Sequence, residues 1–90
     1  MDKQVLVSRE ESQHLTLEKY LVKPNEQISL ETTGNCFYYV ISGYAVMMIE
    51  KYGYSLEPET GLFVPQGSVH EILNTGDVDF SLAIYTSYTN

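Results

Sequence analysis

The 90-residue sequence predicts an all-β fold of about eight short antiparallel strands, arranged as a sandwich or a barrel. Aromatic and β-branched residues are frequent, with eight Tyr and three Phe, and these side chains fit a pleated surface. Turn-forming Gly, Pro, Asn and Asp residues recur every six to ten positions. Beyond about residue 20, no stretch of ten residues keeps a helical period without interruption.

The strands are expected in the runs that lie between the turns. These runs are 14–22, 27–32, 36–41, 44–50, 54–56, 62–64, 69–73 and 80–88. A helical turn is expected around 8–13, where Ser8 can act as an N-cap. The length suits one domain, 1–90, in which 14–88 form the barrel and 1–13 form an N-terminal arm available for a dimer contact.

Charge and composition exclude several functional classes. Twelve Asp and Glu residues against five Lys and Arg give a net charge of -7, and residues 52–90 contain no basic residue. This balance disfavours nucleic acid and anionic membrane surfaces as partners. A single cysteine excludes an internal disulfide, and no secretory segment or membrane-spanning run is recognisable. We therefore expect a soluble, cytoplasmic protein.

Two central runs, 36–41 and 44–50, are apolar on both faces of their expected strands. In the second run, Ala45, Met47 and Ile49 form one apolar set, and Val46 and Met48 belong to the other. A strand with one face in water alternates with polar residues. We therefore expect a second copy of the chain to cover one face in a homodimer; the alternative is a loop or the N-terminal segment folded over it. An Asp at Val46 or Met48 should then unfold the chain or split the dimer.

The two-residue period of a strand places one histidine inside the barrel. Pro65 and Gly67 favour a tight turn just before the run 69–73. Within that run, His70 and Ile72 share one face and Glu71 lies on the other. Because Glu71 belongs in water, His70 and Ile72 are expected to point into the interior.

The segment 61–74 resembles the second conserved motif of the cupin superfamily. Pro65, Gly67, His70 and Asn74 follow one another at the family's spacing, whereas the family's opening glycine falls at Glu59. The segment 38–43 resembles the turn that closes the family's first motif. The resemblance covers 15–88 and implies a cupin-type double-stranded β-helix, or jelly-roll barrel. Segments 37–43 and 61–74 also bear a weaker likeness to the C-terminal cupin of centromere protein C.

The resemblance further implies a divalent transition metal, which cupins hold with a His-x-His pair and a Glu from the first motif and the His of the second. In this chain the Glu position falls at Cys36. The His positions fall, depending on the register, at Leu30 and Thr32, at Ser29 and Glu31, or at Glu31 and Thr33. No register supplies a histidine, so no metal or other cofactor is favoured. His70, Glu31 and Cys36 are the alternative, unorthodox ligands of a divalent metal such as zinc.

Tyrosines in such number suit a ligand pocket or a protein interface, because each combines an apolar ring with a hydroxyl. We expect a non-catalytic, homodimeric cupin module that holds a small apolar or aromatic ligand in its barrel. The expected ligand-binding residues are His70, Tyr39, Tyr44, Met48, Phe63 and Ile72. Two alternatives remain open. One is a metal-dependent isomerase, lyase or oxygenase with unorthodox ligands around His70, and the other is a structural homodimerisation domain of the centromere protein C type.

Overall fold

The computed structural model describes residues 2–88; Met1, Thr89 and Asn90, and the side chain of Glu11, lie outside the described part. Residues 2–88 form nine strands and one helical turn. These elements are β1 (Asp2–Val7), α1 (Arg9–Ser12), β2 (Leu15–Val22), β3 (Gln27–Glu31), β4 (Asn35–Ser42), β5 (Ala45–Ile49), β6 (Tyr52–Leu56), β7 (Gly61–Val64), β8 (Val69–Leu73) and β9 (Phe80–Ser87). The predicted all-β fold is confirmed. Within the described residues, no helix has the length and hydropathy needed to cross a membrane.

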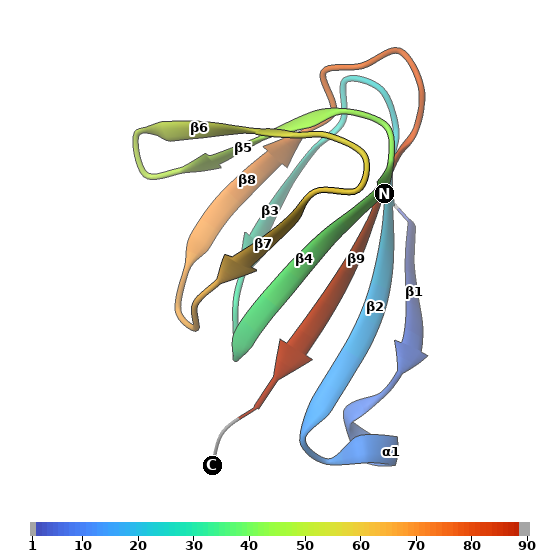
Figure 1. Cartoon of the computed structure of the whole chain (residues 1–90), viewed down its shortest axis with the longest axis vertical. Helices are drawn as coiled ribbons and strands as arrows, with labels where there is room; N and C mark the ends of the chain where they lie inside the picture. Colours follow the sequence, from blue (N-terminus) through green and yellow to red (C-terminus); the bar gives the residue numbers. More distant parts are fainter. Residues whose placement is uncertain (1, 89–90) are drawn as a thin grey trace.

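The strands form two antiparallel sheets that face each other as a jelly roll (Figure 1). The five-stranded sheet has the order β1-β2-β9-β4-β7, and the four-stranded sheet has the order β3-β8-β5-β6. Apolar side chains from both sheets meet between them and exclude water. The fully buried members include Val22, Val40, Met47, Phe80 and Leu82.

The outer faces of the central strands are open in the single chain. In β4, Cys36, Tyr38 and Val40 are buried, whereas Phe37 and Tyr39 are exposed. In β5, the inward residues are likewise buried or half-buried, and the outer face is open to water. Residues 2–12 lie at the edge of the five-stranded sheet and cover neither face, so the alternative of an N-terminal cover is wrong.

The N-terminal segment instead forms β1, an edge strand that the sequence analysis missed. It pairs with β2 from Asp2 opposite Leu21 to Val7 opposite Leu17. Its apolar run of three residues is short and has polar residues on both sides, so its hydrophobic pattern does not predict a strand. Pairing with β2 makes this segment a strand. The helical turn α1, which lies in the range expected for it, connects β1 to β2.

The amide of Asn74 ties together three segments at the end of the molecule that is uppermost in Figure 1. Its Nδ2 donates to the carbonyl oxygens of Val22 and Val78, at 2.9 Å each, and its Oδ1 accepts from the Gly76 N–H at 2.8 Å. All these bonds form at a fully buried residue, where an unpaired amide would be costly. Asn74 therefore fixes the turn between β8 and β9 against the end of β2.

Two glycines with positive φ, Gly43 at 85° and Gly67 at 83°, occupy turns that the sequence identified, but they differ in the space around them. A Cβ at Gly43 would lie 2.5 Å from the carbonyl oxygen of Asp79, whereas nothing lies within 4 Å of one at Gly67. Gly67→Ala is expected to cost about 1–2 kcal/mol of unfolding free energy, from backbone strain alone. Gly43→Ala adds a steric clash and should cost about 2–5 kcal/mol. Urea unfolding followed by circular dichroism measures both, and equal losses would contradict this account.

Candidate functional site

The centre of the barrel is occupied by a hydrogen-bonded pair of side chains, one from each sheet. His70 lies on β8 and Tyr38 on β4, and the Nε2 of His70 is 2.7 Å from the hydroxyl of Tyr38. His70 is 2% exposed and Tyr38 is 1% exposed. Ile72 shares the interior with them, while Glu71 faces water, so the alternation predicted for this strand is observed.

Burial controls the ionisation of both members of the pair. Desolvation lowers the pKa of His70 below its usual 6.5, and the backbone of Ser68 opposes this shift in part. Desolvation also raises the pKa of Tyr38, so its hydroxyl stays protonated. Among the described residues, Nδ1 of His70 makes no hydrogen bond of good geometry. A neutral imidazole and a neutral phenol therefore share one hydrogen bond across the core.

The residues at the cupin metal positions do not fit a metal ion. Leu30 stands opposite His70 in the pairing of β3 with β8, which puts an aliphatic side chain where a ligand would be needed. Thr32 is buried, but its hydroxyl donates to the carbonyl oxygen of Pro65 at 2.6 Å and accepts from the Ser68 N–H at 2.8 Å. The registers that use Ser29 or Thr33 place exposed residues at these positions.

The unorthodox ligand set His70, Glu31 and Cys36 is not brought together either. Glu31 is exposed, whereas Cys36 is buried with its Sγ 3.3 Å from the Thr86 hydroxyl. Burial raises the pKa of the Cys36 thiol, which disfavours the thiolate that a metal requires. Among the described side chains, no group of three His, Cys, Asp or Glu residues comes close enough to hold a metal ion.

Four of the six expected ligand-binding residues lie away from His70 and Ile72. Tyr39 and Phe63 are on the outer face of the five-stranded sheet, 42% and 63% exposed. Met48 stands opposite Glu71 on the outer face of the four-stranded sheet, and Tyr44 lies exposed in the turn before β5. Their neighbours in the sequence point inward instead, because side chains alternate along a strand.

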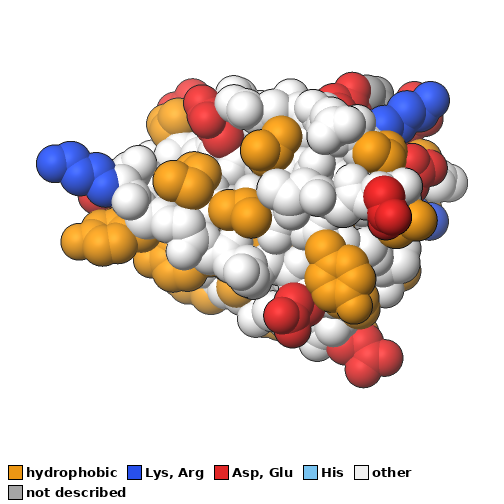
Figure 2. Space-filling view, turned by 90° about the horizontal axis from the view of Figure 1, so that it is seen from above, with side chains coloured by type: hydrophobic (Ala, Val, Ile, Leu, Met, Phe, Trp, Pro, Cys, Tyr) orange, Lys and Arg blue, Asp and Glu red, His pale blue; other side chains and the backbone are white. Residues whose placement is uncertain are grey.

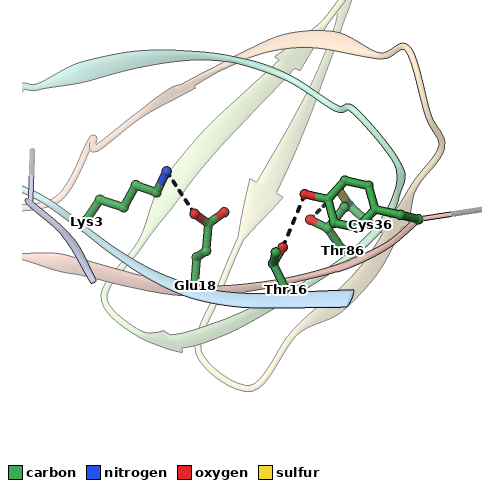
Figure 3. Close-up of polar contacts among 6 residues, drawn as sticks. Lys3, Thr16, Glu18, Cys36 and Thr86 are labelled. Atoms are coloured by element: carbon green, nitrogen blue, oxygen red, sulfur yellow. Dashed lines mark hydrogen bonds and ion pairs between the residues drawn. The ribbon is translucent and has the colours of Figure 1, made fainter. Parts of the chain in front are cut away.

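In residues 15–18, strand β2 has the reverse of the usual alternation, whereas Tyr20 and Val22 further along point into the core. Its half-buried leucines, such as Leu17, lie on the outer face, as the pairing of Leu17 with exposed Tyr85 requires. Thr16, Glu18 and Tyr20 lie on the inner face, and Figure 3 shows Thr16 and Glu18 projecting from β2 towards the space between the sheets. The sequence analysis missed this polar lining, although the alternation of Thr16 and Glu18 with leucines was visible.

The inner face of β2 borders a cavity of about 70 Å³, which we call the β2–β3 cavity. Its lining includes Glu18, Tyr20, Leu30, Cys36, Tyr38 and Thr86. Drug-sized ligands occupy pockets of about 300–1,000 Å³, so this cavity suits only a small molecule. At its edge, Lys3 of β1 forms an ion pair with Glu18, with Nζ 2.8 Å from Oε2 (Figure 3).

The outer side of the same strands carries a continuous apolar surface, which we call the aromatic face. Leu17, Tyr85, Phe37 and Phe63 are successive cross-strand neighbours on β2, β9, β4 and β7. The outward positions of these four strands are the odd-numbered ones, and none of them is Asp or Glu. For a chain with a net charge of -7, this distribution leaves the outer face of these four strands free of negative charge, with Asp2 of β1 at its edge.

The lowered pKa of His70 predicts a specific dependence of stability on pH. Below about pH 6.5, the unfolded chain protonates this histidine while the folded protein does not, so the free energy of unfolding falls as the pH drops. The slope from this group is at most about 1.4 kcal/mol per pH unit. His70→Gln, which can still accept a hydrogen bond from Tyr38, should remove this slope of the unfolding free energy with pH. Urea unfolding of both proteins between pH 7 and pH 5 measures the difference; parallel curves would contradict the prediction.

Comparison with known proteins agrees with this geometry. Residues 5–87 match the sequence profile of the family described as mannose-6-phosphate isomerase C-terminal. A search of curated proteins found no significant match.

Solved structures with the same fold are numerous, and three illustrate the range. A cupin-superfamily protein from Desulfitobacterium hafniense has a TM-score of 0.83 and 22% identity, over 98% of this chain and 77% of its own. The cupin domain of an XRE-family transcriptional regulator from Enterobacter cloacae has a TM-score of 0.86 and 17% identity, over 99% and 97%. A cupin domain from Bordetella pertussis has a TM-score of 0.80 and 12% identity, over 98% and 93%. With the sequence profile covering most of its length, the chain belongs to the mannose-6-phosphate isomerase C-terminal family and is a small cupin domain.

Proposed function

We propose that this cupin is a non-catalytic, homodimeric binding module. A second copy of the chain covers the aromatic face, and the β2–β3 cavity holds a small ligand. The observation that carries the proposal is the reversed alternation of β2, which turns leucines outward and Glu18 inward. Tyr20 and Val22 anchor the inner face of this strand in the core, and the same orientation leaves leucines at the surface and a carboxylate inside, which a partner at the surface and a ligand in the cavity would both favour.

The filled centre of the barrel supports a binding role over metal-dependent catalysis. The Nε2 atom of His70, which would coordinate a metal, already shares a hydrogen bond with the Tyr38 hydroxyl. Leu30 faces it from β3, and Glu31 points away. The ligand is correspondingly small, since an aromatic molecule at the centre would have to displace Tyr38 or Ile72.

The family name refers to an isomerase of a sugar phosphate, and this chain offers little for a phosphate to bind. Phosphate sites use Arg and Lys side chains or groups of backbone N–H donors. At the β2–β3 cavity the nearby ammonium of Lys3 is already paired with Glu18, and the lining itself contains no Lys or Arg. A ligand without a phosphate group fits these residues better.

The homodimer is supported by the shape and charge of the aromatic face. Phe37 and Phe63 are 48% and 63% exposed and lie side by side, which is the kind of patch that marks a protein interface. A two-fold axis through the face would pair it with itself, and the absence of acidic residues there removes like-charge repulsion. A purely structural homodimerisation domain is the second candidate, favoured by the small size of the cavity.

The dimer is tested by one substitution on each sheet. Phe63→Asp puts a charge into the aromatic face and should weaken self-association about 30-fold or more, the effect of about 2 kcal/mol at a central interface residue. Met48→Asp, on the outer face of the other sheet, should leave the dimer intact. The proposed interface thus replaces Val46 and Met48, where the sequence placed a disruptive Asp, with Phe63. Sedimentation equilibrium gives the mass and dissociation constant of each variant. A monomeric wild type, or a dimer split by Met48→Asp alone, would overturn the proposed interface.

A further inference from the structure

The side chain of Lys3 already places a primary ammonium beside the β2–β3 cavity. Its Nζ lies 2.8 Å from Oε2 of Glu18 and 5.9 Å from the centroid of the Tyr20 ring. The side chain of Lys3 is 45% exposed, whereas that of Glu18 is 18% exposed. Figure 3 shows Lys3 reaching from β1 across to the inner face of β2, where Glu18 projects.

We propose that the β2–β3 cavity is a binding site for a small primary alkylammonium compound, and that Lys3 is its built-in competitor for Glu18. This inference rests on the proposed function, because it names the ligand class for the same cavity. Binding exchanges one ammonium for another at the carboxylate, so the site never holds an unpaired buried charge.

The chemistry of the lining favours an ammonium over other groups. A mostly buried carboxylate is costly without a cation, and Glu18 would repel an anionic ligand. A neutral ligand could not replace the charge of Lys3. The face of Tyr20 attracts a cation, and Leu30 and Ile84 in the lining offer apolar contacts to a short alkyl chain.

The size of the cavity limits the alkyl chain. One water position needs about 10–15 Å³, so a cavity of about 70 Å³ has room for about five positions. A linear amine with a few carbons fits this space, whereas a large amine or a peptide does not. The ligand class is therefore the short alkylammonium ions.

Lys3 is held by an edge strand, which can open locally. β1 is the edge strand of its sheet and, among the strands of residues 2–88, pairs with β2 alone. Its register with β2 shifts between Val5 and Val7, and Val5 and Leu6 are 52% and 46% exposed. Local opening of such a strand costs less than global unfolding. A ligand can therefore displace Lys3 while the two sheets stay closed.

The test uses the whole protein, with propylammonium as the probe. Lys3→Ala keeps Cβ, and propylammonium supplies the missing methylene groups and the ammonium. Removal of the competitor should make propylammonium bind at least about tenfold more tightly to Lys3→Ala than to the wild type in isothermal titration calorimetry. Lys3→Gln, a second neutral variant that keeps a long polar side chain, should also bind more tightly than the wild type if Lys3→Ala proves unstable.

Three controls separate this site from general salt effects. Lys19→Ala removes a lysine from the outward side of β2 and should bind propylammonium like the wild type. Glu18→Gln in the Lys3→Ala background should abolish binding, and 1-propanol, a neutral molecule of the same size, should not bind Lys3→Ala. No binding by either Lys3 variant, equal binding by Lys19→Ala and Lys3→Ala, or binding that survives Glu18→Gln would each overturn the inference.

Sedimentation equilibrium of the same samples measures their mass, so the ammonium site and the proposed dimer are tested separately. Lys3 and Glu18 lie on the inner side of the five-stranded sheet, so their variants should retain the wild-type mass. A dimer that does not bind propylammonium overturns the ligand class alone. A monomer that binds it overturns the dimer and leaves the ammonium site supported.

Discussion

The hydrogen bond between Tyr38 and His70 is the constraint on which the arrangement of the two sheets depends. It joins β4 of one sheet to β8 of the other through side chains that are almost fully buried. A buried polar group that loses its partner costs about 1–3 kcal/mol, so sliding either strand by one residue is strongly disfavoured. The packing of the surrounding apolar core is then adjusted to this one relative position of the sheets. The same bond engages the imidazole nitrogen that a metal would need.

A single residue step separates the inside of the five-stranded sheet from its outside. Phe37 and Tyr38 are neighbours in the chain, yet one lies on the aromatic face and the other contacts His70. Glu18 and Lys19 are separated in the same way. Strands β2, β4 and β9 therefore carry two surfaces with different chemistry, and a substitution on one surface leaves the other untouched. This independence makes the proposed dimer and the proposed ligand site separable by substitution.

The sequence predicted the fold well and the position of only some site residues. Run 69–73 was oriented correctly because Glu71 marks the water side of an otherwise apolar strand. Run 36–41 has no such marker, since Phe37 and Tyr39 are as apolar as the residues that point inward. The sequence therefore favours Tyr39 as the residue beside His70, whereas the structure places its neighbour Tyr38 there.

The remaining misses depended on contacts between distant segments. β1 becomes a strand by pairing with β2, whereas its own sequence favours neither a strand nor a loop. In β2 the local rule even pointed the wrong way, because the usual alternation puts leucine inside and Glu18 in water. The pairing of β2 with β1 and β9 is what places Glu18 next to Lys3, on the side of the five-stranded sheet that faces the other sheet.

The distribution of acidic residues bears on the proposed self-association. Glu57 and Glu59 are exposed in the turn after β6, and Asp77 and Asp79 are exposed in the turn after β8. Figure 2 shows acidic side chains spread around the rim of the face that it presents. Glu71 lies on the outer face of the four-stranded sheet, and packed sheets are about 10 Å apart. At physiological ionic strength the screening length is about 8 Å, so charges on the far sheet are largely screened at the aromatic face. The net charge of -7 therefore does not oppose the approach of the proposed second copy to the aromatic face, whose outward positions on β2, β9, β4 and β7 are not acidic.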